Sequence, residues 1–330
     1  MDSLLRTAEP VLAEALEIWL AGDACALATV VATHGSTPRR PGAMLIVRED
    51  GSVVGSISGG CVEGALYESA LEVLSTGVAR IENYGPDGDL LAPGLTCGGS
   101  MSVLVERLDR ASFPILGEIC QRLVDGEGSA FRTTLSDDAC RHTVVDPDGT
   151  PTGLLNNGDV LRVFTPAPRM VVVGSTDFAA EVSALGARMG YHVTACDARP
   201  VFTTAARLPG AHQVVCEWPS DYVARERDSG RFDARSVFVV LTHDPKIDVP
   251  VLIECLDDAR WDVGPFYVGA MGSKRADTRR RRELLSAGLT NEQLIRLSSP
   301  IGLPIGNSGP VETAVSIAAE LVTHEAQRRA

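Results

Sequence analysis

The chain has 330 residues, of which 43 are acidic and 30 are basic, so its formal net charge is −13. This acidic balance argues against a general nucleic-acid-binding protein, because such proteins usually carry a clustered basic face. Hydrophobic residues make up 45% of the chain, which excludes a mostly disordered protein and is enough to fill the cores of about two domains.

Targeting signals and cysteine patterns give little sign of a membrane or secreted protein. The sequence has no run of about 18 apolar residues, so no membrane span is expected. Its first residues lack the pattern of a signal peptide, which predicts a cytoplasmic protein. The 8 cysteines form no C-x-x-C pair, so neither a disulfide framework nor a structural zinc site is predicted.

The first half of the chain predicts a mixed α+β domain over residues 1–165. An amphipathic helix ends at Gly22, and Gly77 ends a second helix over 62–76. Strands are expected at 25–33, 43–47, 52–57, 79–84 and 101–108. Residues 109–165 have one helical pattern and several short strands, and we interpret them as a small β-rich appendage to this domain.

The second half, residues 166–330, alternates short apolar strands with helical patterns. This alternation predicts βαβ units and therefore a Rossmann-like, doubly wound parallel sheet, so the chain as a whole is expected to be α/β. The expected strands lie at 169–174, 191–196, 236–241 and 266–268, and the clearest helices at 177–189 and 310–327.

The loop after the first of these strands partly matches a dinucleotide-binding fingerprint. Gly174 and Ala179 fit the pattern, but Thr176 replaces the central glycine that normally lets a pyrophosphate approach the backbone. Asp177 places a negative charge where the phosphate would lie. Asp197, about 20 residues further on, is well placed to bind a ribose hydroxyl. The loop therefore has two interpretations. It binds NAD(P), or it belongs to a Rossmann scaffold with a changed ligand.

A glycine-rich segment of the first domain, Ser58-Gly59-Gly60-Cys61-Val62-Glu63, is a candidate site. Its two glycines allow close approach of a ligand, and Cys61 precedes a predicted helix, whose N-terminus favours thiolate and oxyanions. Cys61 is thus a candidate nucleophile, sulfur carrier or metal-thiolate ligand. Glu63 is either a nearby proton donor or acceptor, or only a favourable first-turn carboxylate. The alternative is a structural turn with a buried cysteine.

Two further loops of the first domain carry similar signals. Cys97, Gly98 and Gly99 repeat the pattern of a cysteine beside a glycine pair, and Arg39 and Arg40 follow a short turn. Arginine side chains bind phosphate well, so these loops together suggest an anion pocket. A solvated loop is the alternative for the arginines.

In the second domain, residues at the carboxyl ends of two expected strands are candidates. His243 could act as an acid or base, with Asp244 setting its charge. Ser273 begins the next helix with a donor-rich turn that suits phosphate. The alternative for Thr242 and Asp244 is simple helix capping. The arginine run 279–282 is interpreted as a solvated or partner-contacting face.

These motifs, taken in order, resemble those of the xanthine dehydrogenase accessory family, also called XdhC/CoxI. The resemblance rests on GSTPRRPGAMLIV, GSISGGCVEGAL and GLTCGG in the first half and on VVLTHDPKIDVPVL, YVGAMGSKR and PIGLPIG in the second. It spans nearly the whole chain. The sequence departs from the family at residues 174–177, where GSTD stands in place of the glycine loop GAGH.

The resemblance implies an accessory protein that binds molybdenum cofactor (molybdopterin) and helps to sulfurate it or to insert it into a xanthine dehydrogenase-type apoenzyme. It also implies a cysteine desulfurase partner and a homodimer. Cys61 falls where cofactor binding is expected, as ligand or sulfur acceptor, with Cys97 as a second candidate. Two rival functions remain: an NAD(P)-dependent oxidoreductase using the Rossmann half, and a non-catalytic scaffold that brings a desulfurase to the apoenzyme.

Overall fold

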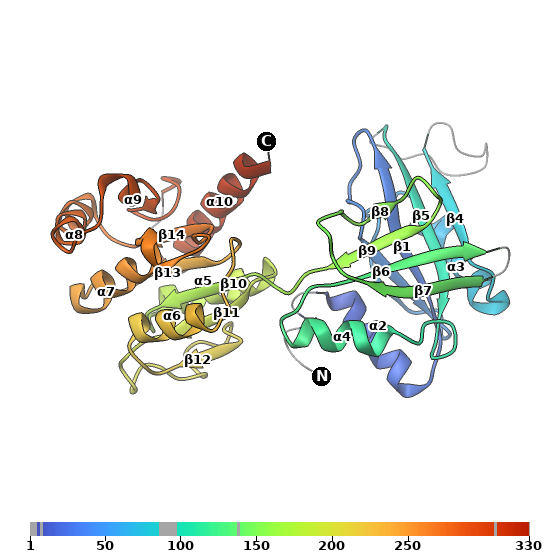
Figure 1. The fold of residues 1–330 in the computed structure, drawn as a ribbon, viewed down its shortest axis with the longest axis horizontal. Coiled ribbons are helices and arrows are strands. Elements are labelled where there is room, and N and C mark those ends of the chain that lie inside the picture. The colour runs from blue at the N-terminus through green and yellow to red at the C-terminus, as the bar shows by residue number, and fades with distance from the viewer. Residues whose placement is uncertain (1–4, 7–8, 86–97, 137–138, 307–308, 330) are drawn as a thin grey trace. The chain divides into compact units, whose positions relative to one another are not determined.

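The computed structural model describes residues 5–6, 9–85, 98–136, 139–306 and 309–329. The chain divides into two compact units, Met1–Pro166 and Ala167–Ala330, called here the first and the second unit. Figure 1 shows β-sheets with a few helices in the first unit, and a sheet flanked by helices in the second.

The first unit is built on an antiparallel sheet of five strands in the order β3-β2-β1-β5-β4. The strands of this sheet are β1 (Cys25–His34), β2 (Met44–Arg48), β3 (Val53–Gly55), β4 (Arg80–Tyr84) and β5 (Ser100–Leu108). The helices that accompany them in the described part of the unit include α2 (Pro10–Ala21), α3 (Glu63–Thr76) and α4 (Leu116–Val124).

Both faces of this sheet are buried, and alternation along β1 shows how. Cys25 and Leu27 belong to a core shared with α2 and α4. Ala26 and Ala28 belong to a second core that is shared with α3. Because successive side chains of a strand point to opposite faces, β1 lacks a polar face and is apolar from Cys25 to Val31 except for the buried Thr29.

A second antiparallel sheet, in the order β7-β6-β9-β8, completes the first unit. Its strands are β6 (Ser129–Ser136), β7 (Ala139–Val145), β8 (Gly153–Leu154) and β9 (Val160–Phe164). Phe131 and Phe164 from this sheet lie in the same core as Leu27 and α2. The stretch interpreted as an appendage is therefore an integral layer, because its aromatic residues fill one face of the main sheet.

A buried charged cluster lies within the first unit. The guanidinium of Arg162, 2% exposed, pairs with the carboxylate of Glu106, 1% exposed. Arg162 also donates to Thr29 Oγ1 at 3.1 Å, and its guanidinium lies 4.7 Å from the ring centroid of Phe131. The Nε2 atom of His142 is 3.2 Å from the second oxygen of Glu106. We call Arg162, Glu106 and His142 the buried triad.

The second unit contains six parallel strands in the order β12-β11-β10-β13-β14-β15. They are β10 (Arg169–Val173), β11 (His192–Cys196), β12 (Gln213–Val215), β13 (Val237–Val240), β14 (Tyr267–Ala270) and β15 (Leu297–Ser298). Counted within the unit, this is the order 3-2-1-4-5-6 of dinucleotide-binding folds. The prediction of a Rossmann-like, doubly wound sheet is confirmed.

Helices cover both faces of the parallel sheet. They are α5 (Asp177–Arg188), α6 (Pro219–Asp228), α7 (Pro245–Leu256), α8 (Lys274–Ser286), α9 (Asn291–Ile295) and α10 (Pro310–Arg329), with the 3₁₀ turn η1 (Asp258–Arg260). One core joins the sheet to α5 and α10, and the other joins it to α6, α7 and α8. Two-sided cover explains why the central strands β10, β13 and β14 are mostly apolar. None of the described helices is both long and apolar enough to cross a membrane.

Candidate functional site

The loops that carry the sequence motifs of the first unit lie at one end of its five-stranded sheet. Antiparallel pairing places the end of β1 beside the start of β5, with His34 opposite Ser100. The same pairing brings the start of β2 beside the end of β3, and the end of β4 beside the start of β5. Residues 35–43, 56–62 and 98–99 therefore follow or precede strands at a common end, which we call the motif edge.

Close packing of glycines ties two of these loops together. A Cβ atom on Gly99 would overlap the backbone carbonyl oxygen of Ser36 and lie 2.8 Å from that of His34. A Cβ atom on Gly35 would meet the Cα atom of Gly99 at 3.5 Å. The glycine pair Gly98-Gly99 and the loop that leads to Arg39 thus meet, as the sequence suggested. Cys97, the other half of that motif, lies outside the described residues.

The carboxylate of Glu63 holds the neighbouring loop of the motif edge. It accepts hydrogen bonds from the N–H groups of Ser58 and Gly59 at 2.9 Å and from that of Gly60 at 2.8 Å. The hydroxyls of Ser56 and Ser58 donate to it as well. Burial acts to raise the pKa of Glu63, but these donors outweigh it and lower the pKa to about 2. Glu63 is therefore ionised at neutral pH, and its oxygens are engaged.

The loop held by Glu63 exposes its glycines. Gly59 and Gly60 are exposed and have φ angles of 74° and 120°, which only glycine adopts easily. A Cβ atom on either would meet no heavy atom within 4 Å, so open space lies above them. Cys61 follows, half-buried, two residues before α3 begins. Arg39 and Arg40 are exposed on the adjacent loop.

In the second unit, Gly174 lies at the point where the strand order reverses, between β10 and β13. A Cβ atom on Gly174 would come within 3.1 Å of Thr242 Cγ2, so a glycine fits the close approach of these two loops. Thr176, which replaces the fingerprint's central glycine, adopts an extended φ of −102° and caps α5 by accepting from Ala179 N at 3.3 Å. Its side chain is thus used to begin the helix.

The predicted ribose-binding acid already has protein partners. Asp197 is fully buried and accepts from Ser175 Oγ at 2.9 Å. The guanidinium of Arg199 forms two further bonds to its carboxylate, at 2.9 and 2.6 Å. Burial acts to raise the pKa of Asp197, but the bonds from Arg199 and Ser175 hold it below its ordinary value. A ribose hydroxyl would have to compete with Arg199 for these oxygens.

The other carboxyl-edge candidates divide into two groups. Asp244 caps α7 by accepting from Lys246 N at 3.0 Å, and Ser273 caps α8 by accepting from Ala276 N at 3.2 Å. His243 is exposed beside these caps. The capping alternative thus describes Asp244 and Ser273, while the ring of His243 faces solvent.

Sequence reasoning missed a buried network at this edge. Arg280, 5% exposed, donates to Asp248 Oδ2 at 3.0 Å and to the carbonyl oxygen of Met271 at 2.7 Å. Asp248 in turn accepts from the hydroxyl of Thr242. Arg280 lies within the run that was interpreted as a solvated face, and that interpretation is wrong for this residue. Of the four arginines only that at position 280 is buried. A run of one residue type has no polar–apolar alternation from which the buried position could be predicted.

The described residues contain no group of three or more His, Cys, Asp or Glu side chains that could hold a metal ion.

Comparisons with known proteins cover both units. Residues 18–85 match the XdhC and CoxI family, and residues 170–321 match the XdhC Rossmann domain. The chain belongs to the XdhC and CoxI family. The first match includes the motif loops at 35–43 and 56–62, and the second includes all of the parallel strands except the start of β10.

Curated relatives extend over most of the chain. It is 28% identical over 313 residues to the "Molybdenum cofactor insertion chaperone PaoD" of Escherichia coli, covering 95% of this chain and 87% of that one. It is 25% identical to a Bacillus subtilis protein named as a probable xanthine dehydrogenase subunit, covering 90% of this chain and 92% of that one. A crystal structure described as a xanthine dehydrogenase from Bacillus halodurans matches with a TM-score of 0.77 at 24% identity, over 96% of both chains. This last likeness shows that the two chains share a fold.

Proposed function

We propose that this protein carries molybdenum cofactor and delivers it to a xanthine dehydrogenase-type apoenzyme. The observation that supports this most is the convergence of three motif loops at one end of one sheet, with open space above Gly59 and Gly60. The Escherichia coli relative, named a molybdenum cofactor insertion chaperone, supports the same role.

At the motif edge, different residues would contact the anionic groups, the ring system and the metal of this ligand. The N–H groups of Gly59 and Gly60 already donate to Glu63, so they do not bind the cofactor's anionic groups. That task falls to Arg39, Arg40 and the first turn of α3, which suit phosphate and oxo groups. The bare glycine backbone lets a flat ring system approach. Cys61 supplies a soft thiolate for a sulfur-rich metal centre, either as ligand or as sulfur acceptor.

Release is part of a carrier's task, and a single thiolate fits it. A metal ion held by one protein sulfur keeps its other ligands from the cofactor, so a client enzyme can exchange that one bond. For Glu63 we propose a positioning role in place of proton handling. A carboxylate with a pKa of about 2 and five donors holds the loop in shape but is a poor proton carrier near neutral pH.

The finer steps form part of the same proposal. The persulfide of a cysteine desulfurase would transfer its outer sulfur to the thiolate of Cys61 or Cys97, leaving a thiol on the desulfurase and a persulfide on this chain. A homodimer would present two such edges. In the second unit, His243 is an exposed polar residue at the carboxyl edge of the parallel sheet, where it could contact a ligand. An NAD(P)-dependent oxidoreductase is disfavoured, because the carboxylate of Asp197 is already bound by Arg199 and Thr176 replaces the central glycine of the fingerprint.

The test is anaerobic co-purification from a host that makes molybdenum cofactor, with molybdenum and pterin assayed per chain. We expect near-stoichiometric pterin in the wild type and loss of it in Cys61→Ala. Cys216→Ala, an exposed cysteine of the second unit, is the matched control and should retain pterin. Equal pterin in wild type and Cys61→Ala would refute the site. Protection of the wild type against heating by NADP, without any pterin, would favour the oxidoreductase.

A further inference from the structure

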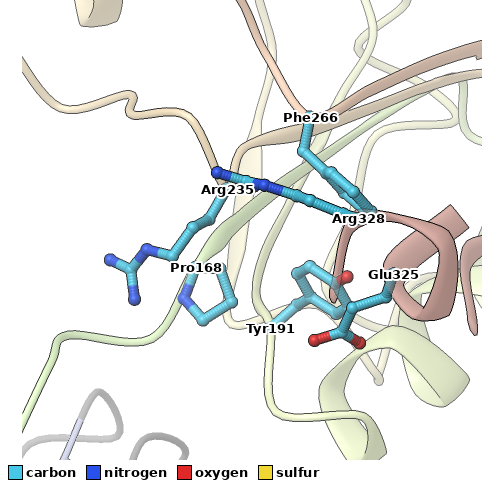
Figure 2. A pocket seen from close by; sticks show the side chains of 6 residues that line it. All are labelled: Pro168, Tyr191, Arg235, Phe266, Glu325 and Arg328. Atoms are coloured by element: carbon cyan, nitrogen blue, oxygen red, sulfur yellow. The ribbon is translucent and has the colours of Figure 1, made fainter. Parts of the chain in front are cut away.

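A pocket of about 330 Å³ opens in the second unit at the edge where the strands begin. Pro168, Tyr191 and Phe266 each directly precede a strand of the parallel sheet, and Arg235 lies two residues before β13. Glu325 and Arg328 come from the last turns of α10 and complete the lining (Figure 2). Ligands of this fold usually bind at the opposite, carboxyl edge, so this pocket is separate from the expected nucleotide site.

A cation is held over an aromatic wall of the pocket. The guanidinium carbon of Arg328 lies 5.7 Å from the ring centroid of Phe266, and Figure 2 shows the arginine side chain crossing that ring. Its Nη1 donates to the carbonyl oxygen of Ala234 at 2.9 Å, which fixes the group in place. Among the described residues no carboxylate lies within 4 Å of it, whereas Arg235 is paired with Asp233 at 2.6 Å. Arg328 is therefore the cation that an anionic ligand would meet.

The opposite side of the pocket carries a carboxylate and a phenol. Figure 2 shows Glu325 beside the ring of Tyr191, which is 8% exposed. Burial, and then the charge of Glu325, raise the pKa of Tyr191, so the phenol remains neutral and can donate. The ring of Tyr191 and that of Phe266 provide flat apolar surface between this side and Arg328.

The lining therefore combines two aromatic rings, one unneutralised cation and one acceptor within a volume at the lower end of the range for small-molecule sites. Aromatic walls favour a flat ring. Arg328 favours an anionic group at one end of the ligand, and Glu325 favours an N–H donor at the other.

We propose that this pocket binds a small heteroaromatic anion with an amino edge, of the class of a purine nucleoside monophosphate. The phosphate binds Arg328, the base lies against Tyr191 and Phe266, and the exocyclic amino group donates to Glu325. The proposal concerns the second unit alone and does not rest on cofactor binding at the motif edge.

The experiment is isothermal titration of the full-length protein with AMP, and separately with adenosine and inorganic phosphate. AMP should bind saturably and more tightly than either fragment. Arg328→Ala should weaken AMP binding by about tenfold or more, since a charge-assisted contact is lost. Arg282→Ala, an exposed arginine of α8, is the matched control and should bind as wild type does.

Circular dichroism first establishes that each variant is folded. Arg328→Lys keeps the charge on an exposed position and should bind AMP with intermediate affinity, so the test stands even where Arg328→Ala is unstable. No AMP binding by the wild type at millimolar concentration would overturn the proposal. So would equal affinity of wild type and Arg328→Ala, or adenosine binding as tightly as AMP.

Discussion

Replacing Arg162 with methionine should destabilise the first unit strongly, whereas replacing Arg162 and Glu106 together by apolar residues should not. The single variant leaves the Glu106 carboxylate, 1% exposed, without its cation. Breaking a buried ion pair from one side typically costs about 3–5 kcal/mol, while apolar replacement of both partners is often neutral or stabilising. The structure therefore predicts a large coupling between the two positions.

The loss in free energy of unfolding comes from the contacts that Arg162 makes. Arg162→Met removes the ion pair, the bond to Thr29 at 3.1 Å and the cation–π contact with Phe131 at 4.7 Å. Methionine keeps much of the apolar packing, so the desolvated carboxylate dominates the loss. We expect a loss of about 4 kcal/mol in the free energy of unfolding, equivalent to roughly 10 °C in melting temperature for a unit of this size.

The assay is urea unfolding followed by the fluorescence of Trp19, which lies in the first unit and donates to the carbonyl oxygen of Phe113 at 3.1 Å. A background with Trp218→Phe and Trp261→Phe removes the signal of the second unit. Arg132→Met is the matched control on a neighbouring strand, because its side chain is 48% exposed, and it should cost less than about 0.5 kcal/mol. A loss below about 1 kcal/mol for Arg162→Met, or a double variant as unstable as the single one, would refute the reasoning.

Burial lowers the pKa of His142 from 6.5 to about 4. The neutral ring therefore contributes up to about 3 kcal/mol to the free energy of unfolding, which is fully present above pH 6.5 and is lost as the pH falls towards 4. His142→Asn should flatten this pH dependence in urea titrations. The adjacent Glu106 carboxylate would favour a charged ring, but Arg162 neutralises it and burial prevails. Asp248→Ala leaves Arg280 buried without its carboxylate and should cost the second unit about 3–5 kcal/mol by Trp261 fluorescence, with Trp19 unchanged. Gly99→Ala should displace the 34–36 loop and lower the pterin per chain. Gly98→Ala should lower it less, because a Cβ atom there meets no heavy atom within 4 Å and the cost is limited to the strain of a φ of 76°. The reverse order would contradict the packing at the motif edge.

Local patterns predicted most of the elements but not how the layers combine. The hairpin of β2 and β3 and the helix ending at Gly77 follow from turn and cap residues, which act over a few positions. The parallel sheet follows from apolar runs alternating with helices. The sequence predicts the second sheet of the first unit as an appendage, because nothing local indicates that Phe131 and Phe164 share a core with Leu27.

At the candidate site too, the sequence predicted the positions of polar residues but not their hydrogen-bond partners. The sequence indicated that Glu63 lies near Gly59 and Gly60, but not that its carboxylate accepts from their N–H groups. It indicated Asp197 at the end of a strand, but not that Arg199 folds back onto it. Proximity along the chain predicts which groups can meet, whereas the partner that a carboxylate selects depends on the local turn.

The hydrogen bonds that hold residues 56–60 to the carboxylate of Glu63 affect how fast a ligand binds and leaves. A loop whose amides are already bonded within the protein is ordered before any ligand arrives, so association does not include the entropy of ordering it. Affinity can then come from few contacts, and dissociation need not wait for the loop to melt. In the proposed carrier role, a loop that needs no reordering lets the ligand leave for a client protein in a single step.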